Sequence, residues 1–254
     1  VGAFALCANT TASDNTAVGK GALLENTTGT RNTAVGKDSL DANTDGNDNT
    51  AIGRTSLSSN TTGDDNAALG VGALQSNTTG LCNTAIGTQA MISSLTGDGN
   101  VAVGYKALYT NNGSTPDFNV AIGRQSLCKN TTGYRNVGSG LNSLFSNTTG
   151  HSNVASGDAA LYSNTTGSNN TGLGKDSLIN ATTGSANVAI GVCAGSDASM
   201  INITTESNRF IAGHNDITNS YVKVDWTVTS DLRDKTEIGD VPHGLEFVDK
   251  LKPV

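Results

Sequence analysis

Residues 15–31 read N-T-A-V-G-K-G-A-L-L-E-N-T-T-G-T-R, and residues 32–48 continue as N-T-A-V-G-K-D-S-L-D-A-N-T-D-G-N-D. The second stretch repeats the first, and an asparagine, numbered here as position 1, opens each unit. Further units open at Asn49, Asn66, Asn83, Asn100, Asn119, Asn136, Asn153, Asn170 and Asn187. The step is 17 residues except between Asn100 and Asn119, where it is 19. A short fixed period predicts a solenoid with one coil per repeat.

Several positions of the unit carry the same kind of residue throughout. Position 5 is glycine in every unit, which predicts a backbone with positive φ or close contact with a neighbouring chain. Position 9 is leucine or methionine, and position 8 of the complete units is alanine or serine. Position 4 is mostly valine, isoleucine or leucine, with Ser139 and Ser156 as exceptions. We expect the columns at positions 4 and 9 to form a thin core that is stabilised by stacking.

The repeat predicts an all-β fold, a parallel β-solenoid of about twelve coils over residues 1–195. The T-T-G before most new units is turn chemistry, and a 17-residue unit is too short for the strand and helix of a leucine-rich repeat. The longer step contains N-G-S-T-P at residues 112–116. It predicts a projecting loop, with the coils on either side still in register.

Composition excludes several classes of function. Aromatic residues make up 4% and charged residues 15% of the chain, and the net charge is −7 without a basic stripe. We therefore expect no nucleic-acid partner. The chain lacks 18 consecutive apolar residues, so we expect no membrane insertion. His151, His214 and His243 lie far apart without cysteine partners at ligand spacing, so neither a metal site nor a cofactor is expected.

The pattern N-T-A-[VI]-G-x-x-[AS]-L resembles the β-roll heads of trimeric autotransporter adhesins, although the coil here is longer than theirs. The resemblance covers residues 1 to about 195. It implies a homotrimer with glycine and small residues near the three-fold axis.

The repeat is lost after Gly191, and residues 196–229 are expected to form a β-rich neck. Within it, the stretch 221–229 alternates apolar and polar residues, with Val222, Val224, Trp226 and Val228 on one face. This alternation predicts a half-buried strand.

The S-D-L-R-D-K of residues 230–235 and the G-L-E-F-V-D-K-L-K-P of residues 244–253 resemble the opening of the endosialidase-type intramolecular chaperone. This C-terminal domain is found on phage tail spikes, tail fibres and some other viral proteins. The resemblance implies that residues 230–254 begin an α/β domain that trimerises the shaft and then cuts itself off. It places the nucleophile at Ser230 and its lysine partner at Lys235.

The implied cleavage lies between Thr229 and Ser230. The Ser230 hydroxyl would attack the Thr229 carbonyl, the amide would become an ester, and water would hydrolyse that ester. Lys235 would act as base, with its pKa lowered by burial or by Arg233, and Asp231 would support the site. This is at most a single-turnover self-cleavage without an external substrate. The alternative is that Ser230 or Asp231 simply caps a short helix.

Cysteines and N-T-T triplets are interpreted structurally. Cys7, Cys82, Cys128 and Cys193 are too far apart along the repeat for a disulfide within one chain, so we expect free buried thiols and assembly in a reducing cytoplasm. A disulfide between chains is the alternative. The triplets match glycosylation acceptors, but stacked Asn and Thr side chains are expected to bond turn backbone and each other. Adjacent threonines should point to opposite sides, which disfavours an ice-binding face.

These observations favour a structural fibre or attachment protein of a phage or virus, assembled in the host cytoplasm and located in the virion. Its expected partners are two further copies of itself and a host receptor or glycan of unknown identity. The alternatives are a bacterial trimeric surface adhesin and, less favoured, an ice-binding solenoid.

Overall fold

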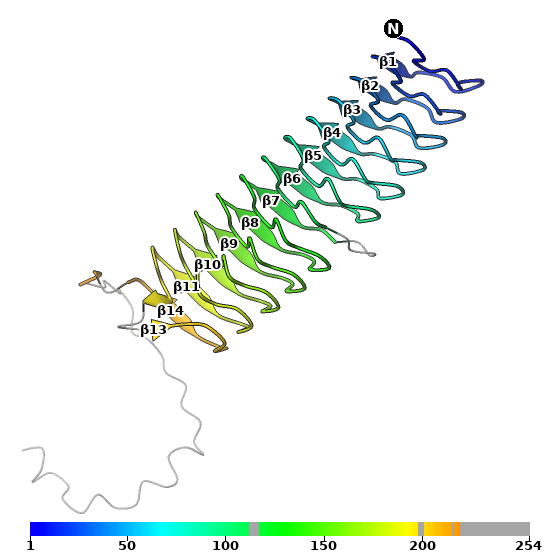
Figure 1. Ribbon diagram of the computed structural model, residues 1–254. Coiled ribbons are helices and arrows are strands. Elements are labelled where there is room, and N and C mark those ends of the chain that lie inside the picture. The colour runs from blue at the N-terminus through cyan, green and yellow to red at the C-terminus, as the bar shows by residue number, and fades with distance from the viewer. Residues whose placement is uncertain (112–116, 198–200, 215, 219–254) are drawn as a thin grey trace, which may run out of the picture. The chain divides into compact units, whose positions relative to one another are not determined.

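Each repeat contributes one three-residue strand to a single parallel sheet (Figure 1). The structure is a computed structural model that describes residues 1–111, 117–197, 201–214 and 216–218. The twelve strands are β1 (Thr16–Val18), β2 (Thr33–Val35), β3 (Thr50–Ile52), β4 (Ala67–Leu69), β5 (Thr84–Ile86), β6 (Val101–Val103), β7 (Val120–Ile122), β8 (Val137–Ser139), β9 (Val154–Ser156), β10 (Thr171–Leu173), β11 (Val188–Ile190) and β14 (Phe210–Ala212). The predicted parallel β-solenoid is confirmed, and ten turns separate β1 from β11.

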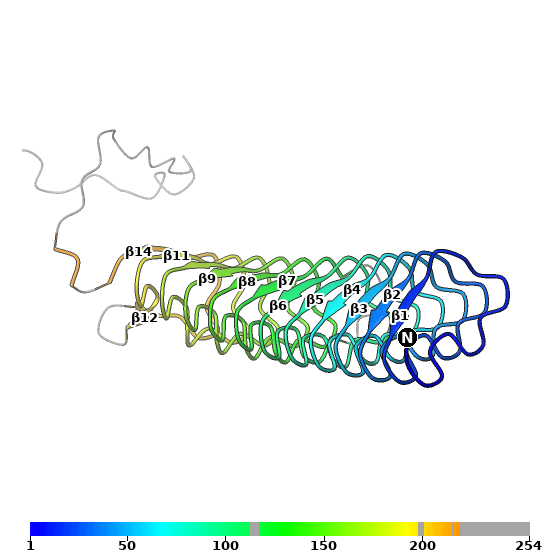
Figure 2. The same ribbon diagram turned by 90° about the horizontal axis from the view of Figure 1, so that it is seen from above.

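Neighbouring strands pair in register, so equivalent repeat positions form continuous columns. Thr16, for example, pairs with Thr33, and Val18 pairs with Val35. Figure 2 shows the strands following one another along one side of the stack. Residues 1–217, which contain the solenoid, form one compact unit.

The core is thin and consists mainly of the columns at positions 3, 8 and 9. The leucine column is fully buried from Leu23 to Leu178, as predicted, with Met91 as its one methionine. Alanine fills most of position 3, and alanine or serine fills position 8. A Cβ added at Gly138, in position 3, would lie 2.4 Å from Ser126 Oγ and 3.0 Å from Ser143 Oγ, both in position 8. The segment that carries positions 8 and 9 therefore packs on the inner face of the sheet.

The prediction that position 4 is buried is wrong. Each strand directs its middle residue inward and its first and third residues outward, as the alternation of a strand requires. The inward residue is small, and the larger position-4 side chain lies on the outer face. With only three residues per strand, the coil has room for one inward side chain there.

The glycine at position 5 is required by close packing of successive coils. These glycines have φ between 121° and 145°, a region that L-residues rarely adopt. A Cβ on Gly104 would lie 2.6 Å from the carbonyl oxygen of Gly123 in the next coil. The positive φ and the close approach of the next coil both occur within one chain. The glycine at position 5 therefore does not require a neighbouring chain.

The position-9 leucines adopt a backbone conformation that the sequence does not suggest. Their φ values lie between 50° and 53° in every coil, in the left-handed region. For an ordinary L-residue that region costs about 1–2 kcal/mol. Full burial of a leucine side chain stabilises by about 1.5–3 kcal/mol, which offsets the cost. The tight turn thus exists because it directs the leucine into the core.

Two ladders of buried asparagines hold the coils together. In the first, Asn32 N–H donates to Asn15 Oδ1 (2.9 Å) and its side chain donates to the Gly46 carbonyl (2.7 Å). In the second, at position 12, Asn43 Nδ2 donates to Asn26 Oδ1 (2.8 Å) and to the same Gly46 carbonyl (2.9 Å). The prediction that stacked Asn and Thr side chains bond turn backbone and each other is confirmed.

The coils keep their register across the longer repeat, as predicted. Val101 pairs with Val120, although 19 residues separate them. The loop prediction itself concerns residues 112–116, which lie outside the described residues. Asp117 follows, with its carboxylate buried, and its Oδ2 accepts from Asn111 Nδ2 at 2.8 Å. This carboxylate replaces the glycine carbonyl that accepts from position 12 in the other coils.

The sheet extends beyond residue 195 into the segment predicted to be a neck. Strand β14 pairs with β11, and Val188 lies opposite Phe210. The 21 residues between these two include a short antiparallel pair, β12 (Ser196–Asp197) with β13 (Ile201–Asn202). One further irregular coil therefore follows the last regular repeat. The alternating stretch 221–229 lies outside the described residues.

Candidate functional site

The residues predicted for self-cleavage lie outside the described part of the chain. Ser230, Asp231, Arg233 and Lys235 all fall in residues 219–254, as does the Thr229–Ser230 bond. Among the residues that are described, no group of three His, Cys, Asp or Glu side chains is placed to hold a metal ion. The described segments also contain no helix long and apolar enough to cross a membrane.

The outer face of the twelve-stranded sheet is the most unusual surface of the molecule. None of the 36 strand residues in β1–β11 and β14 is charged, although charged residues make up 15% of the chain. Seven of the nine large position-4 residues are 37–46% exposed, whereas Val35 and Val103 are half-buried, and together they form an apolar column on this face, which we call the sheet face. The most exposed members of this column are Val18, Ile52, Leu69, Ile86, Ile122, Leu173 and Ile190.

The apolar character of the sheet face is maintained where the column is interrupted. Position 4 becomes serine at Ser139 and Ser156, and in those two strands the other outward residue is an exposed valine, Val137 or Val154. In β14 the outward positions are exchanged in the same way, with Phe210 in the first and Ala212 in the third. Every strand thus presents at least one large apolar side chain outward. A surface with this continuity has the character of a contact surface.

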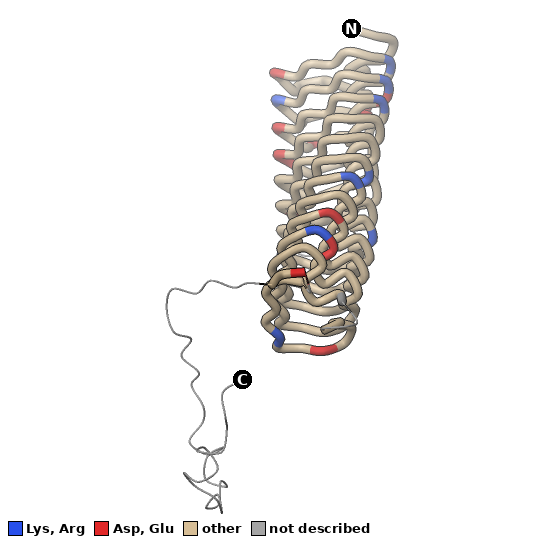
Figure 3. The backbone as a smooth tube through the Cα atoms, turned by 90° about the vertical axis from the view of Figure 1, so that its left-hand side faces the viewer, with Lys and Arg blue, Asp and Glu red and all other residues tan. Residues whose placement is uncertain are grey.

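The two edges of the sheet face carry charges of opposite sign over the first coils. Position 17, just before each strand, holds Asp14, Asp48 and Asp65, whereas position 6, just after it, holds Lys20, Lys37 and Arg54. Figure 3 shows these charges as two rows along opposite edges of the stack.

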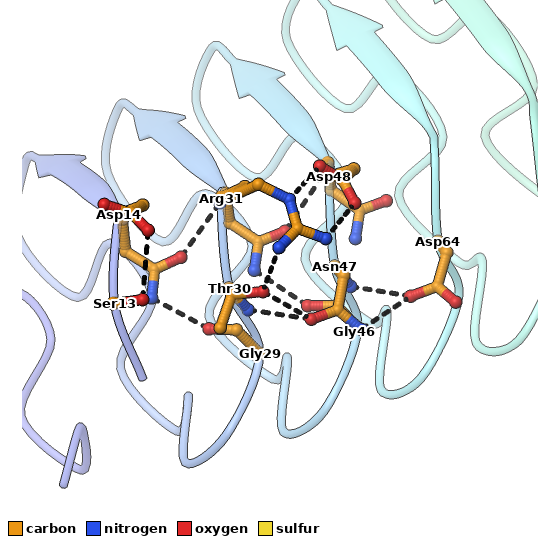
Figure 4. A network of polar contacts seen from close by, with 12 residues as sticks. Ser13, Asp14, Gly29, Thr30, Arg31, Gly46, Asn47, Asp48 and Asp64 are labelled. Atoms are coloured by element: carbon orange, nitrogen blue, oxygen red, sulfur yellow. Dashed lines mark hydrogen bonds and ion pairs between the residues drawn. The ribbon is translucent and has the colours of Figure 1, made fainter. Parts of the chain in front are cut away.

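Arg31 is the one cation in the acidic row, and it is neutralised within the chain. Its guanidinium forms two hydrogen bonds of 2.6 Å to the Asp48 carboxylate in the next coil (Figure 4). This bidentate pair raises the pKa of Arg31 and lowers the pKa of Asp48. The surrounding contacts in Figure 4 are further ladder bonds, such as Asn47 N–H to Asp64 Oδ1 at 2.6 Å. The edge is thus ordered by contacts between coils.

The four cysteines are free, but they are not all buried. Cys7 and Cys82 are exposed, Cys193 is half-buried and Cys128 is buried. The prediction of buried thiols is therefore wrong for Cys7 and Cys82, because position 17, which holds Cys82, points outward and Cys7 stands in the first described coil, with a neighbouring coil on one side only. Burial raises the pKa of the Cys128 thiol, and the nearby Lys106 and Lys129 act in the opposite direction.

Burial also decides the interpretation of the N-T-T triplets. Their asparagines are completely buried from Asn26 to Asn164, so they present no side chain to solvent in the folded chain. The first threonine is half-buried and bonds backbone of the next coil, as Thr61 Oγ1 does with the Thr78 carbonyl (3.1 Å). Only the second threonine, such as Thr62, is exposed. A flat face with two outward threonine columns is absent from the described coils.

Comparison of the chain with protein-family models, with curated proteins and with solved structures finds no match to any of them.

Proposed function

We propose that this chain is the shaft of a homotrimeric fibre in which the sheet face forms the contact between copies. The observation that carries the proposal is the uncharged, continuously apolar outer face of the sheet. Its eleven spacings of about 4.8 Å and its strands of three residues give roughly 50 by 10 Å, or about 500 Å². That lies at the upper end of apolar patches on monomeric proteins, and such patches usually mark interaction sites.

Charge complementarity supports an arrangement around an axis parallel to the solenoid. In any such ring, the position-6 edge of one copy meets the position-17 edge of the next copy at the same height. Lys20 would then face Asp14, and Arg54 would face Asp48. Lys37 would face Arg31, but each of these two cations already has an acidic partner in its own chain. Arg31 pairs with Asp48, and Lys37 Nζ lies 3.2 Å from the Asp38 carboxylate. The number three comes from the resemblance of the repeat to trimeric β-roll heads.

The wider role we propose is that of a phage or virus tail fibre that attaches the virion to a host surface receptor or glycan. The segment from Ser230 to Lys235 supports it, since its pattern resembles the start of a self-cleaving chaperone that would direct assembly in the host cytoplasm. A bacterial surface adhesin is the alternative that the repeat pattern alone would equally suit.

Sedimentation equilibrium at micromolar concentration tests the proposed contact. We expect the wild-type chain to be trimeric, and a double variant with Ile86→Asp and Ile122→Asp to be monomeric with an unchanged circular dichroism spectrum. The matched control is Thr62→Asp with Thr79→Asp, because Asp45 already occupies that outward column. If the aspartates prevent folding, Ile86→Ser with Ile122→Ser should weaken the trimer, since serine occurs naturally at this position in β8 and β9. A monomeric wild type, or face variants that remain trimeric, would overturn the proposal.

A further inference from the structure

Aromatic and basic side chains gather on the middle coils, away from the sheet face. All four tyrosines of the described residues lie between Tyr105 and Tyr162. Between residues 99 and 162 the chain has four lysines and arginines and two acids, the buried Asp117 and the exposed Asp158. The chain as a whole has 22 acids and 15 bases, so this stretch is basic within an acidic protein.

The side chains in this stretch contact one another. Lys106 Nζ lies over two rings, 5.4 Å from the centroid of Tyr105 and 5.1 Å from that of Tyr109. Lys129 Nζ lies 4.9 Å from the centroid of Phe145. The Phe145 ring stacks on Tyr162 with centroids 5.1 Å apart and planes at 4°. These six residues form what we call the aromatic–basic patch.

The patch is continuous because three of its four aromatic residues occupy one column. Tyr109, Phe145 and Tyr162 all stand at position 10, and Cys128 fills the same column between Tyr109 and Phe145. At about 4.8 Å per coil, the column from Tyr109 to Tyr162 extends over roughly 15 Å. Lys106 and Lys129 both oppose the rise in the pKa of the Cys128 thiol that burial causes. The result is a strip of rings with two cations beside it.

The cations of the patch are available to a ligand. Within the part of the chain that the structure describes, neither Lys106 nor Lys129 forms an ion pair with a carboxylate. Arg124, at the margin of the patch, is likewise without one, and it lies 6.0 Å from the Tyr105 centroid. Each ammonium group rests over an aromatic ring, which attracts it without neutralising its charge.

The patch lies on a different side of the coil from the sheet face. Its residues stand at positions 6, 7, 10 and 11, whereas the outward residues of the sheet stand at positions 2 and 4. Positions 8 and 9 pack on the inner face of the sheet, so the segment that carries position 10 lies across the core from it. Contact between copies through the sheet face would therefore leave the patch residues at positions 7, 10 and 11 open to solvent, whereas Tyr105 at position 6 stands on the edge that meets the next copy.

We infer that the aromatic–basic patch binds an acidic oligosaccharide. The ring faces can pack against the C–H surfaces of sugar rings, and the two lysines can bind carboxylate or sulfate groups along the chain. Charge complementarity selects an anionic ligand, and the strip of rings suits an extended one. The inference deepens the attachment role proposed above and rests on it for the source of the ligand. A single-stranded nucleic acid also combines planar groups with anions, so the test includes one.

Isothermal titration calorimetry at about 0.15 M salt, where exposed charges are screened beyond roughly 8 Å, provides the test. The probes are hexasaccharides of sialic acid, galacturonic acid and heparin, with maltohexaose as the neutral sugar and a twelve-nucleotide oligothymidine. We expect at least one acidic hexasaccharide to bind ten times more tightly than maltohexaose and the oligonucleotide. No binding by any acidic sugar, or equal binding by the neutral one, would overturn the inference. Tighter binding of the oligonucleotide would overturn it in favour of nucleic acid.

Variants can be chosen from residues that the solenoid already accommodates. Lys106→Gln copies Gln89 and Gln125 at position 7, and Lys129→Ser copies Ser76 at position 11. We expect this pair of substitutions to weaken binding at least tenfold, as should Tyr109→Gln with Tyr162→Gln. The control is Lys37→Gln with Lys175→Gln, two lysines outside the patch that pair with the adjacent Asp38 and Asp176 in their own chain, and this variant should bind like the wild type. Patch variants that bind normally, or control variants that bind equally poorly, would refute the assignment.

Sedimentation of the same samples separates this inference from the trimer. A monomeric protein that binds the acidic sugar through the patch would retain the inference and reject the proposed assembly. A trimeric protein whose patch binds no acidic sugar would do the reverse.

Discussion

Replacing Gly104 with alanine tests whether successive coils are as closely packed as the structure has them. The Cβ would lie 2.6 Å from the Gly123 carbonyl oxygen and 2.7 Å from its carbon, which are backbone atoms that can move only if the coils separate. The residue would also have to adopt φ of 136°. The conformational strain costs about 1–3 kcal/mol, and the overpacking costs a further 1–3 kcal/mol or so. We expect a loss of about 2–6 kcal/mol at that coil.

Hydrogen exchange is the suitable measurement, because repeat proteins open locally and a single global unfolding free energy is poorly defined for them. Protection of the Gly123 amide, which donates to the Val103 carbonyl at 2.8 Å, should fall by about 30-fold to 10⁴-fold at 1.4 kcal/mol per factor of ten. Protection in the coils of β1 and β2 should be unchanged.

The matched control is Gly72→Gln. Gly72 has φ of 64° in a column where Gln89 and Gln125 adopt nearly the same angle, and a Cβ there would meet only flexible side-chain atoms. The left-handed backbone costs glutamine about 1–2 kcal/mol, so protection of the amide at residue 72, which donates to the Arg54 carbonyl, should fall by only about 5-fold to 30-fold. If Gly104→Ala behaved like this control, the reasoning about coil spacing would be refuted.

Three further predictions concern buried and C-terminal groups. Burial raises the pKa of Asp117 above its ordinary 3.8, so ionisation of this carboxyl destabilises the fold as the pH rises from 3.8. Asp117→Asn should therefore be more stable than the wild type at pH 7. Urea unfolding should show that the stability difference between the variant and the wild type shrinks towards pH 3.8. Ser94→Asn should stabilise the fold by about 1–2 kcal/mol in the same assay. Serine interrupts the position-12 asparagine ladder there and leaves Asn77 Oδ1 buried without a partner. Ser94→Ala should stabilise the fold by less than Ser94→Asn. If the chaperone is complete, mass spectrometry should find cleavage before Ser230, and Ser230→Ala should leave an uncut trimer; an intact wild type would contradict the prediction.

Much of the solenoid was predictable because its repeat is nearly unbroken. The strict spacing of Asn, Gly and Leu indicates stacked coils in register, and the resumption of the pattern at Asn119 indicates that the longer repeat leaves the stacking unchanged. The glycines at position 5 indicate a backbone with positive φ, because glycine adopts that conformation at a lower conformational cost than any other residue. Leu108 and its equivalents give no such sign, because their left-handed backbone is stabilised by burial that only the folded coil provides.

The error at position 4 arose from treating size as a guide to burial. Ile86 is larger than Ala85, yet the alternation of the strand turns Ala85 inward and leaves Ile86 exposed. Reading the alternation strictly from the buried asparagine at position 1 would have placed position 3 inside and position 4 outside. The candidate self-cleavage site depended on a sequence pattern at Ser230 and Lys235, and the described residues end before both.

The outward placement of the larger residues bears directly on assembly. Fully burying a valine, leucine or isoleucine stabilises by about 1.5–3 kcal/mol, and about two-fifths of each position-4 side chain remains exposed, so covering one adds roughly 0.6–1.2 kcal/mol. The seven most exposed members of the column would together add about 4–8 kcal/mol per chain. Association costs about 4–15 kcal/mol in lost translational and rotational freedom. The sheet face alone therefore approximately balances the cost of bringing copies together, and a stable fibre needs the charged edges to contribute as well. For this reason, reversing the charge of Lys20 and Arg54 should weaken the assembly nearly as much as placing charges on the face itself. High salt should weaken the wild-type assembly, because it screens the attraction, and strengthen that of the charge-reversed variant, because it screens the repulsion.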